Sequence, residues 1–196
     1  NQDLEAKGIP VIPTVYQDPT DSKTLADIAA SQGWQELIIK PTISAAAKNN
    51  YRLSQSELET FEDTYQALKR TQSFMIQPFV QEVLEQGEWS VIFFDGEYSH
   101  AVCKKPKAGD YRVQDDHGGS VYFEPPSQEI LDQAQEIVNK LDQNLLYIRL
   151  DGIMMQGQLT VVELELIEPE LFIRNDPKAV SKFADAIEKR LHASHI

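Results

Sequence analysis

Alternating apolar and polar positions predict two β-hairpins. Residues 89–105, WSVIFFDGEYSHAVCKK, contain two β-rich runs separated by Asp95-Gly96, a dipeptide that suits a type I′ turn. Residues 146–155 and 159–166 flank the sequence QGQ and form a second pair of strands. Two shorter apolar runs are also typical of strands: ELIIKP and FMIQPFV, the second of which could instead connect two domains.

Helical periodicity separates these strands. The clearest helix begins at Ser54, where Glu57 completes a capping box and apolar residues then recur along one face. A second helix is expected after an N-cap at Asp21 or Ser22. Further helices are expected over residues 127–143 and 176–191. Strands joined in hairpins and separated by helices favour an α+β fold over a doubly wound parallel sheet.

Composition narrows the class of protein. At 196 residues the chain can form one compact domain or two small lobes, and no apolar run is long enough to span a membrane. A net charge of −13 argues against nucleic acid as the main partner, without excluding a phosphate ligand. The single cysteine, Cys103, excludes an internal disulfide and fits a reducing, cytoplasmic location. We interpret Cys103 as a small buried apolar residue rather than a nucleophile.

The second hairpin concentrates carboxylates. In VVELELIEPELF, Glu163 and Glu165 are two residues apart and therefore point to the same face of a strand. If the turn is centred on Gly157, residues whose numbers add to 314 face each other, so Asp151 faces Glu163 and Arg149 faces Glu165. Three carboxylates this close repel one another unless a cation lies among them, and such oxygen ligands suit Mg²⁺.

A plainer interpretation is a solvated strand face on which Arg149 pairs with Glu165, and a register slip of one residue would separate the carboxylates. Basic residues elsewhere in the chain favour a ligand-binding site over this plainer interpretation. Lys40 ends an apolar strand beside the small-residue loop TISAAAK, Lys104 ends the first hairpin, and Arg112 lies in GDYRVQDDHGG. Together, these cations, the glycine-containing loop and the carboxylates indicate a nucleoside triphosphate site.

The same segments carry a resemblance to a known family. LIIKP, MIQPFV…GE, AVCKKP…YRVQ…GG and YIRLDGI…LTVVELELIEPE occur in family order and span nearly the whole chain. The chain resembles the ATP-grasp superfamily, most closely its glutathione-synthetase-like carboxylate–amine ligases. Around residues 145–172, above all in IEPELF, it is similar to the cycloserine-forming branch.

The resemblance implies an ATP-grasp fold, in which two α+β lobes with antiparallel sheets grip ATP between them. Residues 1–14 would be the end of a preceding element and a linker, 15–76 the smaller lobe, and 77–196 the larger lobe with the metal site. An N-terminal substrate domain, present in family members, would be missing from this chain. Whether the chain is active alone is left open.

Position by position, the resemblance also implies roles for individual residues. The nucleotide-binding positions would be Lys40, Ser44, Gln77, Phe79, Val80, Glu88 and Lys104, with 77–80 as the adenine hinge and Glu88 near the ribose. The catalytic positions would be Lys104, Arg112 and Arg149, and the metal ligands Asp151, Glu163 and Glu165.

The implied reaction has two steps: a carboxylate attacks the γ-phosphate of ATP to form an acylphosphate, and an amine then displaces phosphate. The implied cofactors are ATP and Mg²⁺, with Mn²⁺ as an alternative. The implied partners are a small-molecule carboxylate, an amine and the missing N-terminal domain. A homo-oligomer is left open, and neither nucleic acid nor a membrane is expected.

Some positions depart from the family pattern. The loop after Lys40 is rich in alanine where relatives have glycines, Gln114 replaces a common Asn, and Ser90 replaces a substrate-binding arginine of glutathione-type enzymes. Among the histidines, only His117 is a candidate functional residue. Glu168 and Glu170 either receive a substrate ammonium, with Glu168 favoured, or are solvated strand ends.

Two other functions compete with the ligase. One is a nucleotide- or metal-binding module of the same fold without ligase activity, which would have no need of the intact carboxylates and Lys40. The other is an acidic Ca²⁺-binding or interaction domain, which is disfavoured because the sequence contains no EF-hand loop.

Overall fold

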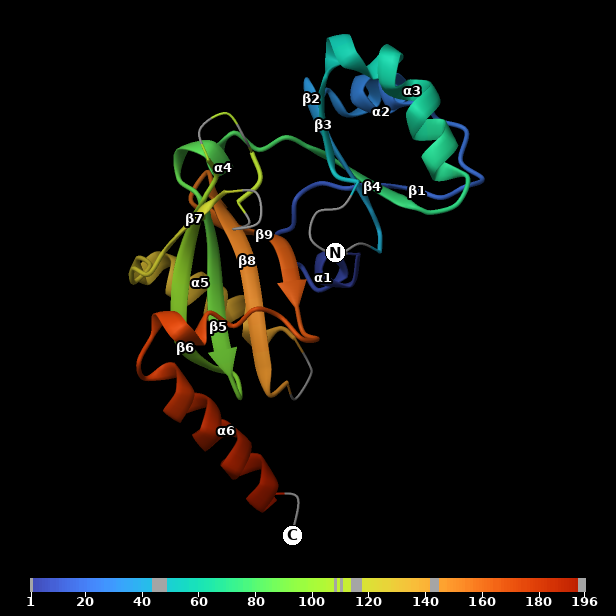
Figure 1. Ribbon diagram of the computed structural model, residues 1–196. Helices are drawn as coiled ribbons and strands as arrows, with labels where there is room; N and C mark the ends of the chain where they lie inside the picture. The colour runs from blue at the N-terminus through green and yellow to red at the C-terminus, as the bar shows by residue number, and fades with distance from the viewer. Residues whose placement is uncertain are drawn as a thin grey trace. The chain divides into compact units, whose positions relative to one another are not determined.

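A computed structural model of the chain describes residues 2–43, 49–107, 109, 111–113, 118–141 and 145–193. The chain divides into two compact units, Ile12–Val80 and Asn1–Val11 together with Gln81–Ile196. Each unit contains one antiparallel sheet and helices, so the predicted α+β class is confirmed (Figure 1).

The smaller unit is built on a four-stranded sheet in the order β1-β4-β2-β3. Its elements are β1 (Val15–Gln17), α2 (Leu25–Gln32), β2 (Glu36–Pro41), β3 (Tyr51–Ser54), α3 (Gln55–Lys69) and β4 (Phe74–Pro78). Apolar side chains of α2 and α3 pack on this sheet, and Ile28, Ile39 and Tyr65 are fully buried in the resulting core.

The two helices of this unit begin at capping boxes. The Ser54 N–H donates to Glu57 Oε2 at 2.8 Å, as predicted from the sequence. The predicted N-cap of α2, at Asp21 or Ser22, was wrong. Thr24 is the N-cap, and it exchanges hydrogen bonds with Asp27. Asp21 lies in the preceding turn, where its carboxylate accepts the Asp18 N–H at 2.8 Å.

The larger unit is built on a five-stranded sheet in the order β7-β6-β5-β8-β9, with every neighbouring pair antiparallel. Its elements are α1 (Gln2–Ala6), α4 (Glu82–Glu85), β5 (Glu88–Phe94), β6 (Glu97–Lys105), β7 (Ser120–Tyr122), α5 (Gln128–Asn139), β8 (Tyr147–Met155), β9 (Gln158–Glu165), η2 (Ile173–Asn175) and α6 (Ala179–Ala193). Both predicted hairpins are present as β5–β6 and β8–β9.

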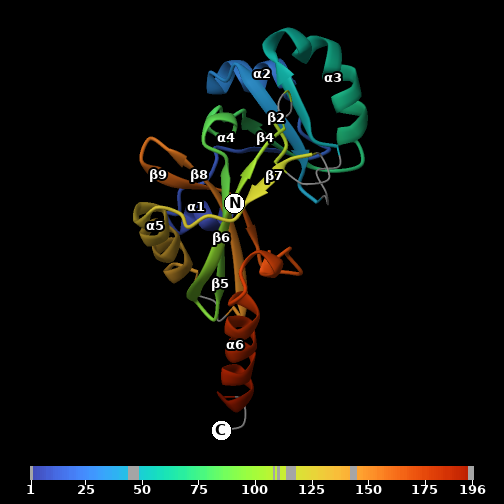
Figure 2. The same cartoon turned by 60° about the vertical axis from the view of Figure 1, so that its left-hand side comes forward.

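The two faces of the larger sheet have different roles. One face packs against α5, whose Ile130, Ala134 and Ile137 meet Val91 and Leu150 of the sheet (Figure 2). Because side chains alternate along a strand, neighbouring residues of β5 and β6 point to the opposite face.

Part of that opposite face is apolar. Ile92, Phe94 and Val102 pack there with Phe172 and with Ala186 of α6. Farther along the same face, beyond Ile92 and Val102, the strands carry charged and polar side chains, and these form the candidate site described below.

The first residues of the chain pack into the larger unit. Leu4 of α1 and Ile9 are buried in the core beneath α5. The Val161 N–H of β9 donates to the carbonyl of Pro10 at 2.9 Å, and Val11 forms a parallel bridge with Val161. This segment therefore adds backbone pairing to β9, the strand that carries Glu163 and Glu165.

Candidate active site on the β8–β9 hairpin

A β-bulge sets the register of the carboxylates. The hairpin turns through two residues, Gln156 and Gly157, both with positive φ, so Met155 pairs with Gln158. The turn is therefore centred between Gln156 and Gly157 rather than on Gly157, and paired residue numbers near the turn add to 313 instead of the predicted 314. The bulge between Asp151 and Gly152 then shifts the register by one residue.

Beyond the bulge, Asp151 pairs with Glu163 and Arg149 with Glu165, as expected from the sequence. Without it, Glu163 would face Leu150, whose side chain lies in the core under α5. A one-residue shift moves every side chain of a strand to the other face, so the bulge turns Glu163 out of the core.

Gly152 lies beside this bulge, where β8 and β9 approach so closely that a side chain would not fit. A Cβ at position 152 would lie 2.9 Å from Leu159 Cδ1 and 3.2 Å from the Thr160 carbonyl oxygen.

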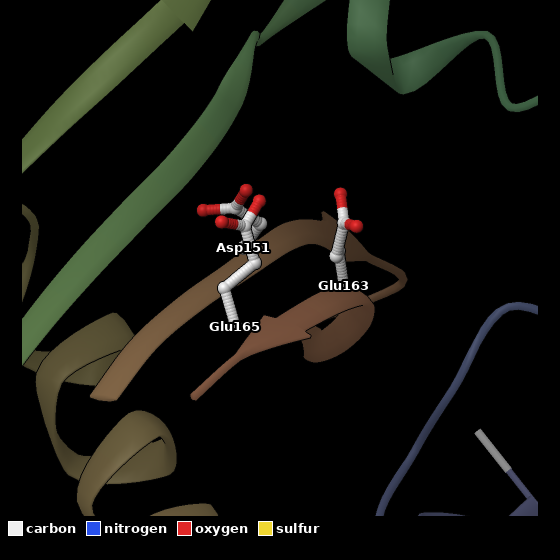
Figure 3. Close-up of side chains that lie close together, drawn as sticks. All are labelled: Asp151, Glu163 and Glu165. Atoms are coloured by element: carbon white, nitrogen blue, oxygen red, sulfur yellow. The ribbon is translucent and has the colours of Figure 1, made fainter. Parts of the chain in front are cut away.

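The three carboxylates converge. Asp151, Glu163 and Glu165 each offer one oxygen, and these oxygens lie within 4.8 Å of one another. Figure 3 shows the three groups projecting from the same face of the hairpin. Asp151 is buried, Glu165 is half-buried and Glu163 is exposed, so the cluster is accessible from one side. Three oxygen donors at this spacing suit a hard divalent cation such as Mg²⁺.

Two neighbouring strands hold Asp151 in place. Ser90, directly opposite Asp151 on β5, donates its hydroxyl hydrogen to Asp151 Oδ1 at 2.6 Å. Lys104 of β6 donates to Asp151 Oδ2 at 3.0 Å, and its Nζ also lies 2.5 Å from Glu88 Oε1. The structure thus places Glu88 against Lys104 inside the cluster. The role of Ser90 was missed because a serine in a strand carries no signal of its partner.

Arg149 links the cluster to the chain that follows β9. Its Nε and Nη2 donate to the two oxygens of Asp151 at 3.1 and 2.9 Å, and Nη2 also donates to Glu165. Nη1 donates to the carbonyl of Glu170 at 3.2 Å. The predicted Arg149–Glu165 pair is present, but within a larger network.

The network fixes the charges of its members. Burial would raise the pKa of Asp151, but Lys104 and Arg149 outweigh it and lower the pKa of this carboxyl. Burial likewise opposes the charged form of Lys104, yet Asp151 and Glu88 raise the pKa of its ammonium. For Glu88 and Glu165 burial prevails and raises the pKa of each carboxyl, against the opposing charges of Lys104 and Arg149. Asp151 is therefore held as an anion between two cations.

The segment after β9 is anchored from the sheet. Glu170 accepts the Phe172 N–H at 2.8 Å and pairs with Arg174 at 3.1 Å. Its carboxylate is thus used within its own segment, which does not support the idea that Glu170 receives a substrate ammonium. Glu168 is exposed, with a left-handed φ of 46°, and its N–H donates to the Tyr147 hydroxyl at 3.4 Å.

A histidine outside the predicted set completes this anchor. His100 of β6 is buried, with Nε2 2.8 Å from the Leu171 carbonyl and Nδ1 2.9 Å from the Ser99 hydroxyl. The carbonyl can only accept, so Nε2 carries the hydrogen in this contact. Arg149 and His100 thus hold two consecutive carbonyls, those of Glu170 and Leu171.

Among the predicted nucleotide-binding residues of the smaller unit, Lys40 and Gln77 lie on the adjacent strands β2 and β4, and Phe79 and Val80 follow β4 directly. Lys40 on β2 pairs in register with Met75 on β4. Gln77 donates to the Thr14 hydroxyl at 2.8 Å, and the Phe79 N–H donates to the Glu36 carbonyl at 3.0 Å. Val80 is largely buried, and the Arg52 guanidinium stacks over the Phe79 ring at 3.5 Å.

The remaining candidates from the sequence are Arg112, Ser44, Gln114, His117 and Cys103. Arg112 is half-buried in the described stretch 111–113. Ser44, Gln114 and His117 lie outside the described residues. Cys103 is a free, buried thiol, as predicted. Among the described helices, none has the length and apolar character needed to cross a membrane.

Comparisons with known proteins identify the family to which the chain is similar. Residues 13–185 match the family model of the prokaryotic glutathione synthetase ATP-grasp domain. The cycloserine biosynthesis protein DcsG of Streptomyces lavendulae is 31% identical over 206 residues, covering 96% of this chain and 67% of that protein.

Solved structures show the same fold. The crystal structure of D-cycloserine synthetase DcsG matches with a TM-score of 0.80 and 28% identity, over 97% of this chain and 68% of that one. D-alanine–D-alanine ligase from Bacillus anthracis, solved with ATP, shares the fold with a TM-score of 0.70 at 16% identity, over 100% of this chain and 66% of the ligase. The resemblance found in the sequence, including that to the cycloserine-forming branch, is confirmed: the chain belongs to the ATP-grasp family of ATP-dependent ligases.

Proposed function

We propose that the protein is an ATP- and Mg²⁺-dependent ligase that joins a carboxylate to an amine through an acylphosphate. The observation that carries this proposal is the convergence of Asp151, Glu163 and Glu165 within 4.8 Å, with the basic side chains of Lys104 and Arg149 against them. Carboxylates that hold divalent cations beside fixed cations are the groups that phosphoryl transfer requires.

The proposed ligation proceeds in two steps. A carboxylate oxygen of the substrate attacks the γ-phosphorus of ATP, the bond to the β-phosphate oxygen breaks, and ADP leaves. The amine then attacks the acyl carbon, inorganic phosphate leaves, and the amine loses a proton. Metal ions at Asp151, Glu163 and Glu165 would neutralise phosphate charge, and Lys104, Arg112 and Arg149 would balance the charge that develops in each transition state.

Roles in nucleotide binding are part of the proposal. On the family resemblance, Lys40 would contact the phosphates and Ser44 would be a further nucleotide-binding position. Gln77, Phe79 and Val80 would contact the adenine, and Glu88 would lie near the ribose. The ion pair of Glu88 with Lys104 makes Glu88 also a partner of a phosphate-binding cation. Mn²⁺ is expected to replace Mg²⁺, since both are hard cations that take oxygen ligands.

The similarity to D-cycloserine synthetase supports a proposal for the substrate class. A ring-closing ligase joins a carboxylate and an amine of the same molecule, so the first substrates to test are small amino-acid derivatives that carry both groups. Ser90 argues against glutathione-like substrates, because it stands where glutathione-type enzymes are expected to have a substrate-binding arginine, and its hydroxyl donates to Asp151 instead.

A panel assay tests the proposal. Phosphate release from ATP is measured with Mg²⁺ and a panel of amino-acid derivatives, and hydroxylamine is added in parallel to trap an acylphosphate as a hydroxamate. We expect Glu163→Gln to abolish substrate-dependent phosphate release, whereas Glu136→Gln, an exposed carboxylate of α5, has no effect. Nucleotide binding with no phosphate release on any substrate would favour the binding module instead.

A further inference from the structure

The Asp151 carboxylate has no acceptor position left in the contacts of the folded chain. Four donor groups reach it: Ser90 Oγ at 2.6 Å and Arg149 Nε at 3.1 Å on Oδ1, and Lys104 Nζ at 3.0 Å and Arg149 Nη2 at 2.9 Å on Oδ2. An ionised carboxylate offers about four acceptor positions, two on each oxygen. A metal ion can bind Asp151 only if one of these donors is displaced.

These donors are buried and difficult to displace singly. Asp151, Ser90 and Lys104 are 1%, 0% and 5% exposed, and Arg149 is 8% exposed. Lys104 is held on its other side by Glu88, which is itself 8% exposed. Moving a buried cation away from its carboxylate leaves an uncompensated charge, unless another anion receives it.

The charge of the cluster favours a divalent cation all the same. Glu88, Asp151, Glu163 and Glu165 carry four formal negative charges, and Lys104 and Arg149 carry two positive ones. The excess equals the charge of one divalent ion, but Asp151, the most buried of the three carboxylates, is the one that both Lys104 and Arg149 contact. A polyphosphate would supply anionic oxygens to receive the displaced ammonium and guanidinium groups.

We infer, on the basis of the proposed ATP- and Mg²⁺-dependent function, that Lys104 and Arg149 close Asp151 to a free divalent cation, so that the site takes the cation together with a polyphosphate. The two basic residues then change partner, from Asp151 to phosphate, as the metal reaches Asp151. In the absence of nucleotide, the contacts of Lys104 and Arg149 hold the metal site in a low-affinity state.

The test measures the binding of Mn²⁺ alone, by electron paramagnetic resonance of the free ion, in the absence of nucleotide. The double variant Glu88→Gln with Lys104→Met removes one buried anion and one buried cation together, so the net charge of the cluster is unchanged and no unpaired charge is created. Because it frees an acceptor position of Asp151, we expect it to bind Mn²⁺ at least about tenfold more tightly than the wild type.

Two further variants make the result specific. Ser90→Ala frees one position on Oδ1 without changing any charge, and a gain of about threefold is expected from the loss of one hydrogen bond. Lys189→Met removes a cation that pairs with Asp95 at the other end of the same sheet, and no gain is expected. The inference requires that the donors around Asp151 fill its acceptor positions, and Ser90 is one of these donors. The Ser90→Ala measurement therefore tests this requirement even if the double variant does not fold.

The outcomes separate the inference from the proposed function. Unchanged or weaker Mn²⁺ binding in a folded double variant, or in Ser90→Ala, would overturn the inference. Binding of Mn²⁺ with a non-hydrolysable ATP analogue is measured in parallel on the wild type. If the wild type does not bind that complex, the proposed function fails, whatever the variants do with Mn²⁺ alone.

Discussion

Asp151 is the residue on which the stability of the site depends. Its charge is compensated by Lys104 and Arg149 inside the protein, whereas Glu163 is exposed. A buried ion pair contributes little net stability compared with an apolar replacement, but the loss of one partner is costly because the other charge stays buried. Substitutions of Asp151 and of Glu163, two of the proposed metal ligands, should therefore differ sharply in their effect on the free energy of unfolding.

We predict that Asp151→Asn lowers the free energy of unfolding by about 3–5 kcal/mol, because two buried cations lose their shared anion. Glu163→Gln should change it by less than about 0.5 kcal/mol, as expected for an exposed position. Urea unfolding at neutral pH, followed by circular dichroism, compares the two. Equal losses for both variants would mean that the Asp151 network does not stabilise the fold.

At the scale of elements, the hairpin and its bulge position the site. Gly152 lies where a side chain would meet Leu159, and the bulge beside it keeps Glu163 out of the core. Bulges next to functional sites commonly re-aim a side chain in this way.

We predict that Gly152→Ala destabilises the protein by about 1–3 kcal/mol through overpacking, and that it reduces metal affinity by disturbing the register of Glu163. Leu159→Val removes the methyl group that the new Cβ would meet. The double variant should therefore lose less stability than the sum of the two single variants in a double-mutant cycle. Strict additivity would contradict the proposed contact.

The segment after β9 is a second element-scale feature, because it depends on His100. Burial lowers the pKa of the His100 imidazole, against the carbonyl of Leu171 and the charge of Asp176, so the folded protein favours the neutral ring. The unfolded chain then binds a proton more readily, and the stability from neutral His100 is present above the ordinary pKa of 6.5 and lost as the pH falls through the folded value.

His100→Gln should remove this pH dependence, while its amide can still donate to the Leu171 carbonyl. We predict that the wild type loses unfolding free energy faster than His100→Gln as the pH is lowered from 7.5 to 5. Urea titrations across that range provide the measurement, and parallel losses in the two proteins would count against the role of His100.

The sequence predicted the elements better than their details. Alternation and turn dipeptides located both hairpins, and the spacing of Ser54 and Glu57 located the cap of α3. The bulge at Gly152 could not be predicted, because it depends on how closely β9 approaches β8 rather than on any local pattern. The correct pairing of Asp151 with Glu163 was reached from an incorrect turn, since the bulge compensated for the error of one residue.

Hydrogen-bond partners that lie on separate strands also could not be predicted from the sequence. Ser90, Lys104 and Asp151 lie on three adjacent strands, and no spacing along the chain relates them. The cluster of Asp151, Glu163 and Glu165, the proposed metal ligands, was predictable because two of them lie on one strand and the third on its hairpin partner. His100 was missed because its partner, the Leu171 carbonyl, lies 71 residues away.

At the scale of the whole molecule, the chain has two compact units, and each has its own sheet and core. The chain spans about two thirds of the length of DcsG. The family is established by matches over most of the chain, while the metal site of the larger unit and the nucleotide-binding residues of the smaller unit are proposals that a single binding experiment can address together.

The most direct test is calorimetric titration of the protein with ATP, with and without Mg²⁺. We predict measurable binding only when Mg²⁺ is present, loss of that Mg²⁺ dependence in Glu163→Gln, and wild-type behaviour in Glu136→Gln. Binding of ATP with equal affinity in the presence and absence of Mg²⁺, or unaltered Mg²⁺-dependent binding in Glu163→Gln, would contradict the assignment of Asp151, Glu163 and Glu165 as the metal site.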